Sequence, residues 1–300
     1  HLRVPKICLS VVFNNQFEKN IPKLRNIYKD RFSTIRYLSP FSNCKAPEVI
    51  PVCETSVHFQ GYFAQAFTHL PKDCEYYVFC GDDLILNPGL NESNLIEALN
   101  CKHSSYIKYL NPIWEHSFAW HKFDECNQFT EKEYTVPYQN LLPSRKELLI
   151  IYENHGLKYR NLGFHNFQGI KEKGITTNRI KSGVSYFFRN GNKRFINYPL
   201  VEGYSDFVVV PRSHIELFCH YCGIFAAMNL WVDAAVATSL LLCGSPIKTE
   251  NESNYIGTEY WNNSEIKEKL KSANNNLDEI EKLFNDNELY IHPIKLSAYN

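Results

Sequence analysis

The chain has 300 residues, of which 44% are apolar and 21% charged, and this composition excludes disorder as a description of the whole protein. Lysine plus arginine and aspartate plus glutamate number 32 each, so the formal net charge is zero. Proteins that bind nucleic acid through its phosphates usually carry a basic excess, so we expect no nucleic-acid partner. The length suits one large α/β domain or two modest ones.

The first 111 residues alternate between strand and helix patterns. Strands are expected at Lys6–Phe13, Thr34–Leu38 and Glu75–Cys80, where β-branched and aromatic residues form short apolar runs. A helix capped by Asn20 follows the first strand, and a second helix is expected near Val57–Thr68. This order predicts a parallel sheet with right-handed crossovers.

The middle of the chain is less regular. The proline-punctuated segment Pro40–Pro51 is expected to be a loop, Leu95–Leu99 a short helix and Ser105–Leu110 a strand. Residues 112–200 show weak periodicity and are interpreted as a loop-rich insertion. Two tryptophans and two histidines lie close together there, and they could form a platform for an acceptor sugar or part of a satellite core: Trp114, His116, Trp120 and His121.

Regular patterns return in residues 201–300. Asp206–Val210 is an expected strand, Ser213 is expected to cap a helix ending near Cys222, and Leu230–Leu242 is a second apolar helix. Ser264 is expected to cap an amphipathic helix before a β-like pair near the end of the chain. We therefore predict a single domain over residues 1–300, with a nucleotide-binding half (1–111), the insertion (112–200) and an acceptor-side half (201–300).

The strongest chemical pattern is Gly81-Asp82-Asp83, which directly follows a buried strand. Acids at the carboxyl end of a parallel strand face the crevice in which α/β proteins bind ligands. Two neighbouring carboxylates repel each other unless a cation or hydrogen-bond donors stabilise them. The residues alone therefore leave two alternatives, a divalent-metal site or an ordinary turn.

This strand and its acids resemble the D-x-D motif of the GT-A family of nucleotide-sugar-dependent glycosyltransferases. The resemblance implies a Rossmann-like, mostly parallel α/β fold, a Mn²⁺ or Mg²⁺ ion and a nucleotide-diphosphate sugar as donor. It makes Asp83 the metal ligand and Asp82 a contact to the nucleotide or sugar. The sequence departs from the motif because Gly81 stands in the first acid position, which puts the ribose contact in doubt.

Further segments match the family in the same order. The resemblance places Phe13, Asn14 and Asn15 against the base and ribose, although they also suit a plain strand-to-helix turn. Asp233, near a helix start, matches the catalytic base of inverting members, and Asp206 could bind a donor-sugar hydroxyl. Both acids have ordinary alternatives, because aspartate is common early in helices and at strand ends.

The end of the chain supplies two more candidates. Many family members return a late histidine to the metal, so His292 is expected as a second metal ligand, and Lys295 could approach the diphosphate. Together these residues predict a metal-dependent hexosyl- or pentosyltransferase, inverting if Asp233 is the base, with a glycan, lipid or protein acceptor.

Two alternatives remain to this function. Gly81 gives some weight to a non-catalytic carbohydrate- or nucleotide-binding protein on the same fold. A nucleotidyltransferase is less favoured, because Phe13-Asn14-Asn15-Gln16 stands where a glycine-rich basic loop is expected.

The ten cysteines are expected to be reduced, because Cys8 and Cys80 lie inside apolar runs. Cys219 and Cys222 have C-x-x-C spacing, but no second pair completes a zinc site. No transmembrane segment or signal peptide is evident. We therefore expect a cytoplasmic protein. The alternative is a lumenal domain of a membrane-anchored protein, which the three glycosylation sequons at Asn91, Asn251 and Asn262 would suit.

Overall fold

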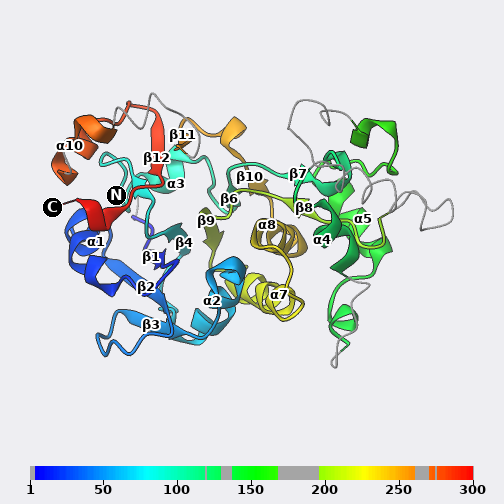
Figure 1. Ribbon diagram of the computed structural model, residues 1–300, viewed down its shortest axis with the longest axis horizontal. Coiled ribbons are helices and arrows are strands. Elements are labelled where there is room, and N and C mark those ends of the chain that lie inside the picture. The colour runs from blue at the N-terminus through cyan, green and yellow to red at the C-terminus, as the bar shows by residue number, and fades with distance from the viewer. Residues whose placement is uncertain are drawn as a thin grey trace.

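The computed structural model describes residues 4–118, 120–129, 137–167, 196–260, 270–273 and 276–299. Its centre is a seven-stranded sheet with the order β10-β6-β9-β4-β1-β2-β3 (Figure 1). In chain order these strands are β1 (Ile7–Val12), β2 (Thr34–Pro40), β3 (Val49–Val52), β4 (Tyr76–Gly81), β6 (Ser105–Ile107), β9 (Phe207–Pro211) and β10 (Ile247–Lys248).

The central sheet is mostly parallel, as expected. Strand β1 pairs in parallel with β2 and β4, β2 with β3, and β6 with β10. Strand β9 runs antiparallel to both β4 and β6. All six residues of β1 and of β4 are buried, which explains why these strands are apolar on both faces. The mixed α/β fold predicted from the sequence is confirmed.

Helices cover both faces of the sheet. The described helices are α1 (Ile21–Tyr28), α2 (Gln60–Ala66), α3 (Leu95–Ala98), α4 (Phe123–Gln128), α5 (Arg145–Asn154), α7 (Ile215–Ala227), α8 (Val232–Leu242) and α10 (Leu277–Glu281). Alternate strand residues enter two separate hydrophobic clusters, one shared with α2, α7 and α8 and the other with α1 and α3. In Figure 1, α4 and α5 lie beyond α8, away from β1–β3.

Three phenylalanines join α2 and α7 to the middle of the sheet. The ring of Phe63 lies 4.3 Å from that of Phe79 on β4 and 5.7 Å from that of Phe218 on α7, measured between centroids. All three side chains are almost fully buried. Each such ring removes a large apolar area from water, so this contact fixes both helices against β4. The end of β4, where the candidate acids lie, therefore rests on a rigid support.

Two small sheets bring distant parts of the chain to the carboxyl end of β4. Strand β12 (Glu288–His292) lies between β11 (Ile256–Glu259) and β5 (Ile85–Leu86). Beyond β12, the backbone N–H of Ile294 donates to the carbonyl of Asp83 at 2.6 Å. Strands β7 (Asn111–Pro112) and β8 (Val201–Glu202) form the second small sheet. The C-terminal segment is thus attached to the acid pair.

Several expected details differ in the structure. The segment expected to be a proline loop contains β3, an edge strand. Pro51 is exposed there, and an edge position tolerates its missing N–H. The described part of residues 112–200, expected to be loop-rich, contains α4 and α5.

The helix caps also differ from expectation. Helix α1 begins after Asn20, but no side-chain cap bond from Asn20 is found in the described residues. Helix α7 begins after His214 rather than Ser213, whose hydroxyl pairs with the His214 ring instead. The expected cap at Ser264 lies outside the described residues.

All ten cysteines are described and all are free thiols. None of the helices within the described ranges is long and apolar enough to cross a membrane.

Candidate active site

Most of the candidate residues gather at one edge of the central sheet. The parallel strands β1 and β4 end at this edge, and the antiparallel strand β9 begins there. Asn14, the acid pair and Asp206 are therefore brought together, and the N–H of Gly81 donates to the carbonyl of Asp206 at 3.0 Å. The carboxyl edge of a parallel sheet is where ligands bind in α/β folds.

Asp82 points inward and joins two strand ends. Its carboxylate accepts a hydrogen bond from the backbone N–H of Asn14 at 3.2 Å, and its own N–H donates to the carbonyl of Val12 at 2.9 Å. The side chain is buried, and burial together with the charge of Asp83 raises the pKa of Asp82 to about 7. Asp82 thus positions the loop after β1 relative to Asp83.

Asp83 and His292 lie in direct contact, although 209 positions separate them in the sequence. The Nε2 atom of His292 is 3.0 Å from Oδ1 of Asp83. The Nδ1 atom of the same ring pairs with the hydroxyl of Tyr204. Burial disfavours the charged ring, but the attraction of Asp83 and Asp206 outweighs it and raises the pKa of His292. Both ring nitrogens are therefore held in fixed positions.

This pair fits a divalent-metal site that a substrate would complete. The Asp83 oxygen and the His292 nitrogen are 3.0 Å apart, the distance of a direct hydrogen bond. Adjacent ligands of an octahedral ion with bonds of about 2.1 Å are also about 3.0 Å apart, so a metal could replace the proton between them. Across the described ranges, no group of three or more His, Cys, Asp or Glu side chains is placed to hold a metal. Ions in nucleotide sites often have only one or two protein ligands and take the others from phosphate and water.

Gly81 faces two carboxylates. A Cβ atom built on Gly81 would lie 3.1 Å from Oδ1 of Asp83 and 3.8 Å from Oδ1 of Asp206. Asp206 directly precedes β9 and lies opposite Gly81, whose N–H donates to its carbonyl, so its carboxylate points toward the place of the missing acid. Burial raises the pKa of Asp206 to about 6 although the charge of His292 opposes this shift. The site thus keeps a second carboxylate near Asp83 from another strand.

Asp233 lies in the first turn of α8 and holds the turn before β9. Its Oδ1 atom accepts hydrogen bonds from the hydroxyl and the backbone N–H of Ser205, and its carbonyl accepts from the N–H of Gly203 at 3.3 Å. Burial raises the pKa of Asp233 to about 7, the bond from Ser205 opposes the shift, and Asp206 and Glu202 reinforce it. A carboxyl group with this pKa can exchange a proton near neutral pH.

A cavity of about 550 Å³ opens beside the acids, at the ends of β1, β2 and β3. The segments that line it are Asn14–Phe17, Pro40–Phe41, Glu54–Ser56 and the side chain of Tyr62. Two of its aromatic rings are well exposed, Phe17 at 37% and Phe41 at 55%. Its position, size and aromatic rings suit a nucleoside.

Two predicted residues occupy different surroundings from the others. The side chain of Phe13 is fully buried and meets the ring of Tyr37, with centroids 6.2 Å apart, so it belongs to the core below the cavity. Lys295 is exposed and follows Ile294, the residue that pairs with the Asp83 backbone. The structure thus brings together Asn14, both acids of the pair, Asp206, His292 and Asp233, while Asn15 lines the cavity and Lys295 lies at the periphery.

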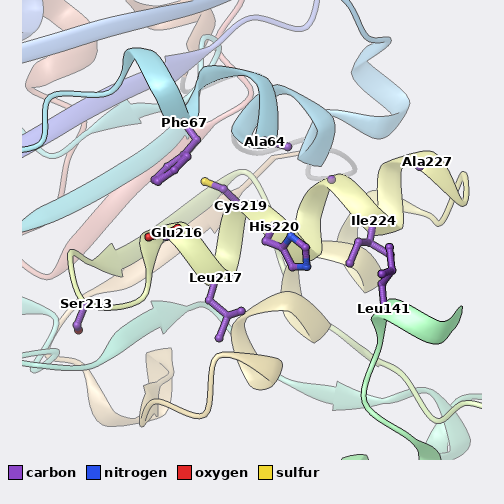
Figure 2. A pocket seen from close by; sticks show the side chains of 11 residues that line it. Ala64, Phe67, Leu141, Ser213, Glu216, Leu217, Cys219, His220, Ile224 and Ala227 are labelled. Carbon is purple, nitrogen blue, oxygen red and sulfur yellow. The ribbon is translucent and has the colours of Figure 1, made fainter. Parts of the chain in front are cut away.

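A larger hollow, of about 740 Å³, lies between α2 and α7 (Figure 2). Phe67, Cys219 and His220 are among its lining residues. None of the residues predicted for the site lines this hollow. We therefore do not assign the active site to this hollow, although its volume is larger than that of the cavity beside the acids.

Sequence reasoning missed four residues that the structure places at the site. Tyr204 and Ser205 directly precede Asp206, so this predicted neighbour was the available signal. Glu202 comes from the two-residue strand β8, and Tyr62 from the buried face of α2. The sequence offers no pattern for the last two, because only the packing brings them to this edge.

Comparisons with known proteins give similarities to solved structures only. No family model and no curated protein matches the chain. The mannosyltransferase Ktr4p from S. cerevisiae aligns with a TM-score of 0.40 and 11% identity over 84% of this chain and 70% of that one. Core-mannan synthase A (CmsA/Ktr4) from Aspergillus fumigatus, in its Mn/GDP form, aligns with a TM-score of 0.37 and 13% identity over 84% and 74% of the two chains. Neither alignment assigns this chain to a family.

Proposed function

We propose that this protein is a metal-dependent glycosyltransferase that moves a sugar from a nucleotide-diphosphate sugar to an acceptor hydroxyl with inversion. One observation carries the proposal. A nucleoside-sized cavity, a metal-compatible Asp83–His292 pair and the buried carboxyl group of Asp233 follow one another along the carboxyl edge of the sheet. That order matches the order of base, diphosphate and reacting sugar carbon in a nucleotide sugar.

The donor would lie with its base in the cavity after β1. Asn14 and Asn15 line that cavity, and Asn14 is bonded to Asp82, so the nucleoside and the diphosphate would be positioned by one connected unit. Asp83 and His292 would hold a Mn²⁺ or Mg²⁺ ion, which supplies positive charge to the leaving diphosphate when bound. The exposed side chain of Lys295 would add a second positive charge near the diphosphate.

The orientation of His292 supports this assignment. The Tyr204 hydroxyl also forms a hydrogen bond with Asp206, where it can only donate if that carboxyl group is ionised. The same hydroxyl then accepts a bond from Nδ1–H of His292. Without a metal, Nε2 shares a proton with Asp83. When a metal binds, Nε2 would lose this proton and present its lone pair, while Nδ1–H keeps the ring in place.

Asp233 would act as general base. The hydrogen bonds found for its carboxylate within the described ranges both reach Oδ1, so Oδ2 is the oxygen that takes the acceptor proton. As the acceptor oxygen bonds to the anomeric carbon, its proton passes to Oδ2 and the bond from that carbon to the diphosphate oxygen breaks. The nucleoside diphosphate leaves with the electron pair.

Calorimetric titration of nucleoside diphosphates tests the donor site. We expect one nucleotide of a panel of five to bind wild type in the presence of Mn²⁺, and to lose most of that affinity without Mn²⁺ or in Asp83→Ala. Glu97→Ala, on the surface of α3, is a control that should bind as wild type does. If no nucleotide binds the folded protein, the proposal fails.

The two other functions give different results in the same experiments. A non-catalytic binding protein would bind a nucleotide with Mn²⁺ but would transfer sugar from no donor. A nucleotidyltransferase would release inorganic diphosphate from a nucleoside triphosphate. No observation in the described residues favours either of them over the transferase.

A further inference from the structure

Four aromatic side chains form a continuous strip next to Asp233, and we name His116, Trp120, His121 and Trp231 the aromatic strip. The rings of His116 and Trp120 stack, with centroids 4.5 Å apart and an interplanar angle of 19°. Trp120 meets His121 at 6.2 Å, and His121 meets Trp231 at 6.0 Å, both edge to face. Residues from two segments more than 100 positions apart thus build one surface.

The strip lies at the border of the hydrophobic core, against which Trp120 and Trp231 pack. Trp114, its neighbour in sequence, is fully buried and stacks on Tyr152, with centroids 5.5 Å apart. His121, in contrast, is exposed, and His116, Trp120 and Trp231 are partly exposed. The cluster seen in the sequence therefore divides into one core residue and three that are at least partly exposed, and Trp231 joins these from the start of α8.

Both ends of the strip are linked to the proposed general base, one through the chain and the other through Glu202. Trp231 directly precedes α8, two residues before Asp233. At the other end, Nε2 of His116 lies 3.2 Å from a carboxylate oxygen of Glu202, a buried residue whose charge acts on Asp233. An acceptor lying on this strip would therefore place a hydroxyl close to the Asp233 carboxylate.

We infer that the aromatic strip binds a pyranose ring of the acceptor, so the acceptor is a glycan; this rests on the proposed glycosyltransferase function. A pyranose has C–H bonds on its faces and hydroxyls around its rim. Flat rings bind the faces, and polar groups at their edges bind the rim. The strip offers both, since Trp120 and Trp231 are partly exposed flat rings and His121 is an exposed imidazole.

Charged neighbours favour a sugar over a lipid chain. The ammonium group of Lys122 lies 4.3 Å from the centre of the Trp231 ring and 2.7 Å from a carboxylate oxygen of Glu125. Asn111 donates to Glu202 at 3.0 Å at the other end. Lys122 and Glu125 are partly exposed. A hydrocarbon chain would remove them from water without replacing their hydrogen bonds to it, whereas hydroxyls can replace them.

Saturation-transfer NMR with the methyl glycosides of glucose, galactose and mannose tests the inference directly. We expect ring C–H signals from at least one glycoside with wild type, about tenfold weaker binding in Trp120→Ala, and recovery of most of it in Trp120→Phe. His121→Ala should also weaken binding. His220→Ala, an exposed histidine of α7, is its matched control and should bind as wild type does.

Kinetics separate this role from a merely structural one. With a glycan acceptor, Trp120→Ala and His121→Ala should raise the acceptor KM about tenfold and leave nucleotide affinity within twofold. The inference is overturned if none of the three glycosides binds the folded wild type, or if His121→Ala and Trp120→Ala both bind them as wild type does. Nucleotide binding without glycoside binding would contradict the role of the aromatic strip and leave the proposed transferase function standing. Glycoside binding without nucleotide binding would contradict the proposed transferase function and leave the strip as a sugar-binding surface.

Discussion

The proposed donor and acceptor ends of the candidate site are built in different ways. At the donor end, Asn14 and the acid pair each follow a parallel strand. The Asn14 N–H donates to the Asp82 carboxylate, and the Asp82 N–H donates to the carbonyl of Val12. At the acceptor end, Asp233 depends on Ser205, and His116 on Glu202, so residues from separate segments hold each other. The donor end is therefore fixed by the sheet, whereas the acceptor end exists only once the rest of the chain has packed around it.

Removing the Asp233 charge should have the largest effect, because it should reduce sugar transfer strongly and leave nucleotide binding almost unchanged. Asp233→Asn keeps an oxygen for the bonds from Ser205 but cannot accept a proton. We expect transfer to fall by about 10²–10⁴-fold, with nucleotide affinity within about twofold of wild type. In wild type, kcat/KM should rise with pH and level off above about 7, because Asp233 must be ionised. Glu202, Asp206, Tyr109 and Cys126 are the titratable groups that interact with it.

Stability provides the control for this variant. The pKa of Asp233 is higher in the folded state than its ordinary value of 3.8, so the folded state binds the proton more tightly. Wild type should lose unfolding free energy through this group as pH rises from 3.8 to about 7. Asp233→Asn avoids that loss and should be at least as stable as wild type at pH 8 in urea titration. Full transfer activity in the variant would remove Asp233 from the mechanism.

Restoring the acid of the family motif should damage the donor end rather than improve it. Gly81→Asp places a Cβ atom 3.1 Å from the Asp83 carboxylate and adds a third charge beside Asp83 and Asp206. We expect it to lower the free energy of unfolding by about 1–3 kcal/mol and to weaken Mn²⁺-dependent nucleotide binding. Urea titration and calorimetry measure these two effects.

Gly81→Ala separates space from charge, since it brings the Cβ atom without the carboxylate. It should cost less stability than Gly81→Asp. If Gly81→Asp binds Mn²⁺ and nucleotide more tightly than wild type, Asp206 does not take the place of the missing acid.

The donor end could be predicted from the sequence because its signal is local. A buried strand followed by polar residues places those residues at a sheet edge, and this rule located Asn14 and the acid pair. Phe13 shows the limit of the rule. Its side chain packs under the cavity against Tyr37, because residues alternate between faces at the end of a strand.

The acceptor end could be predicted only in part. Asp206, Asp233 and the cluster around Trp120 are predicted from the sequence, but the contacts that join them depend on register and packing. The sequence has no sign that β9 runs antiparallel, and only this direction sets Asp206 opposite Gly81. Strand β8 has two residues, too few for a periodic pattern, yet it carries Glu202. Trp231 joins the aromatic strip through a contact with His121 across 110 positions of sequence.

Tyr204 connects the two ends, and removing its hydroxyl should weaken the donor end by a moderate amount. Tyr204→Phe loses the hydrogen bond that orients His292, so we expect about tenfold weaker Mn²⁺-dependent nucleotide binding. Tyr290→Phe is the matched control. Its ring stacks on Tyr204 at 6.1 Å, but its hydroxyl bonds to Glu259 instead. Equal nucleotide affinity in both variants would exclude an orienting role for Tyr204.

The smallest expected effect lies in the donor cavity itself. The hydroxyl of Tyr62 is buried, lines this cavity and has no hydrogen-bond partner among the described residues. An unpaired buried hydroxyl destabilises the fold, so Tyr62→Phe should leave the free energy of unfolding unchanged or raise it by about 1 kcal/mol. If a bound nucleotide pairs with this hydroxyl, the same change should weaken nucleotide binding by about two- to tenfold.

Tyr37→Phe distinguishes the two effects. Its hydroxyl is also buried without a partner in the part of the chain that the structure describes, but Tyr37 does not line the donor cavity. Both variants should therefore have similar stability in urea titration, and only Tyr62→Phe should reduce nucleotide affinity in calorimetry. A loss of nucleotide affinity of the same size in both would mean that the hydroxyls act through the packing of the sheet, and that Tyr62 does not contact the donor.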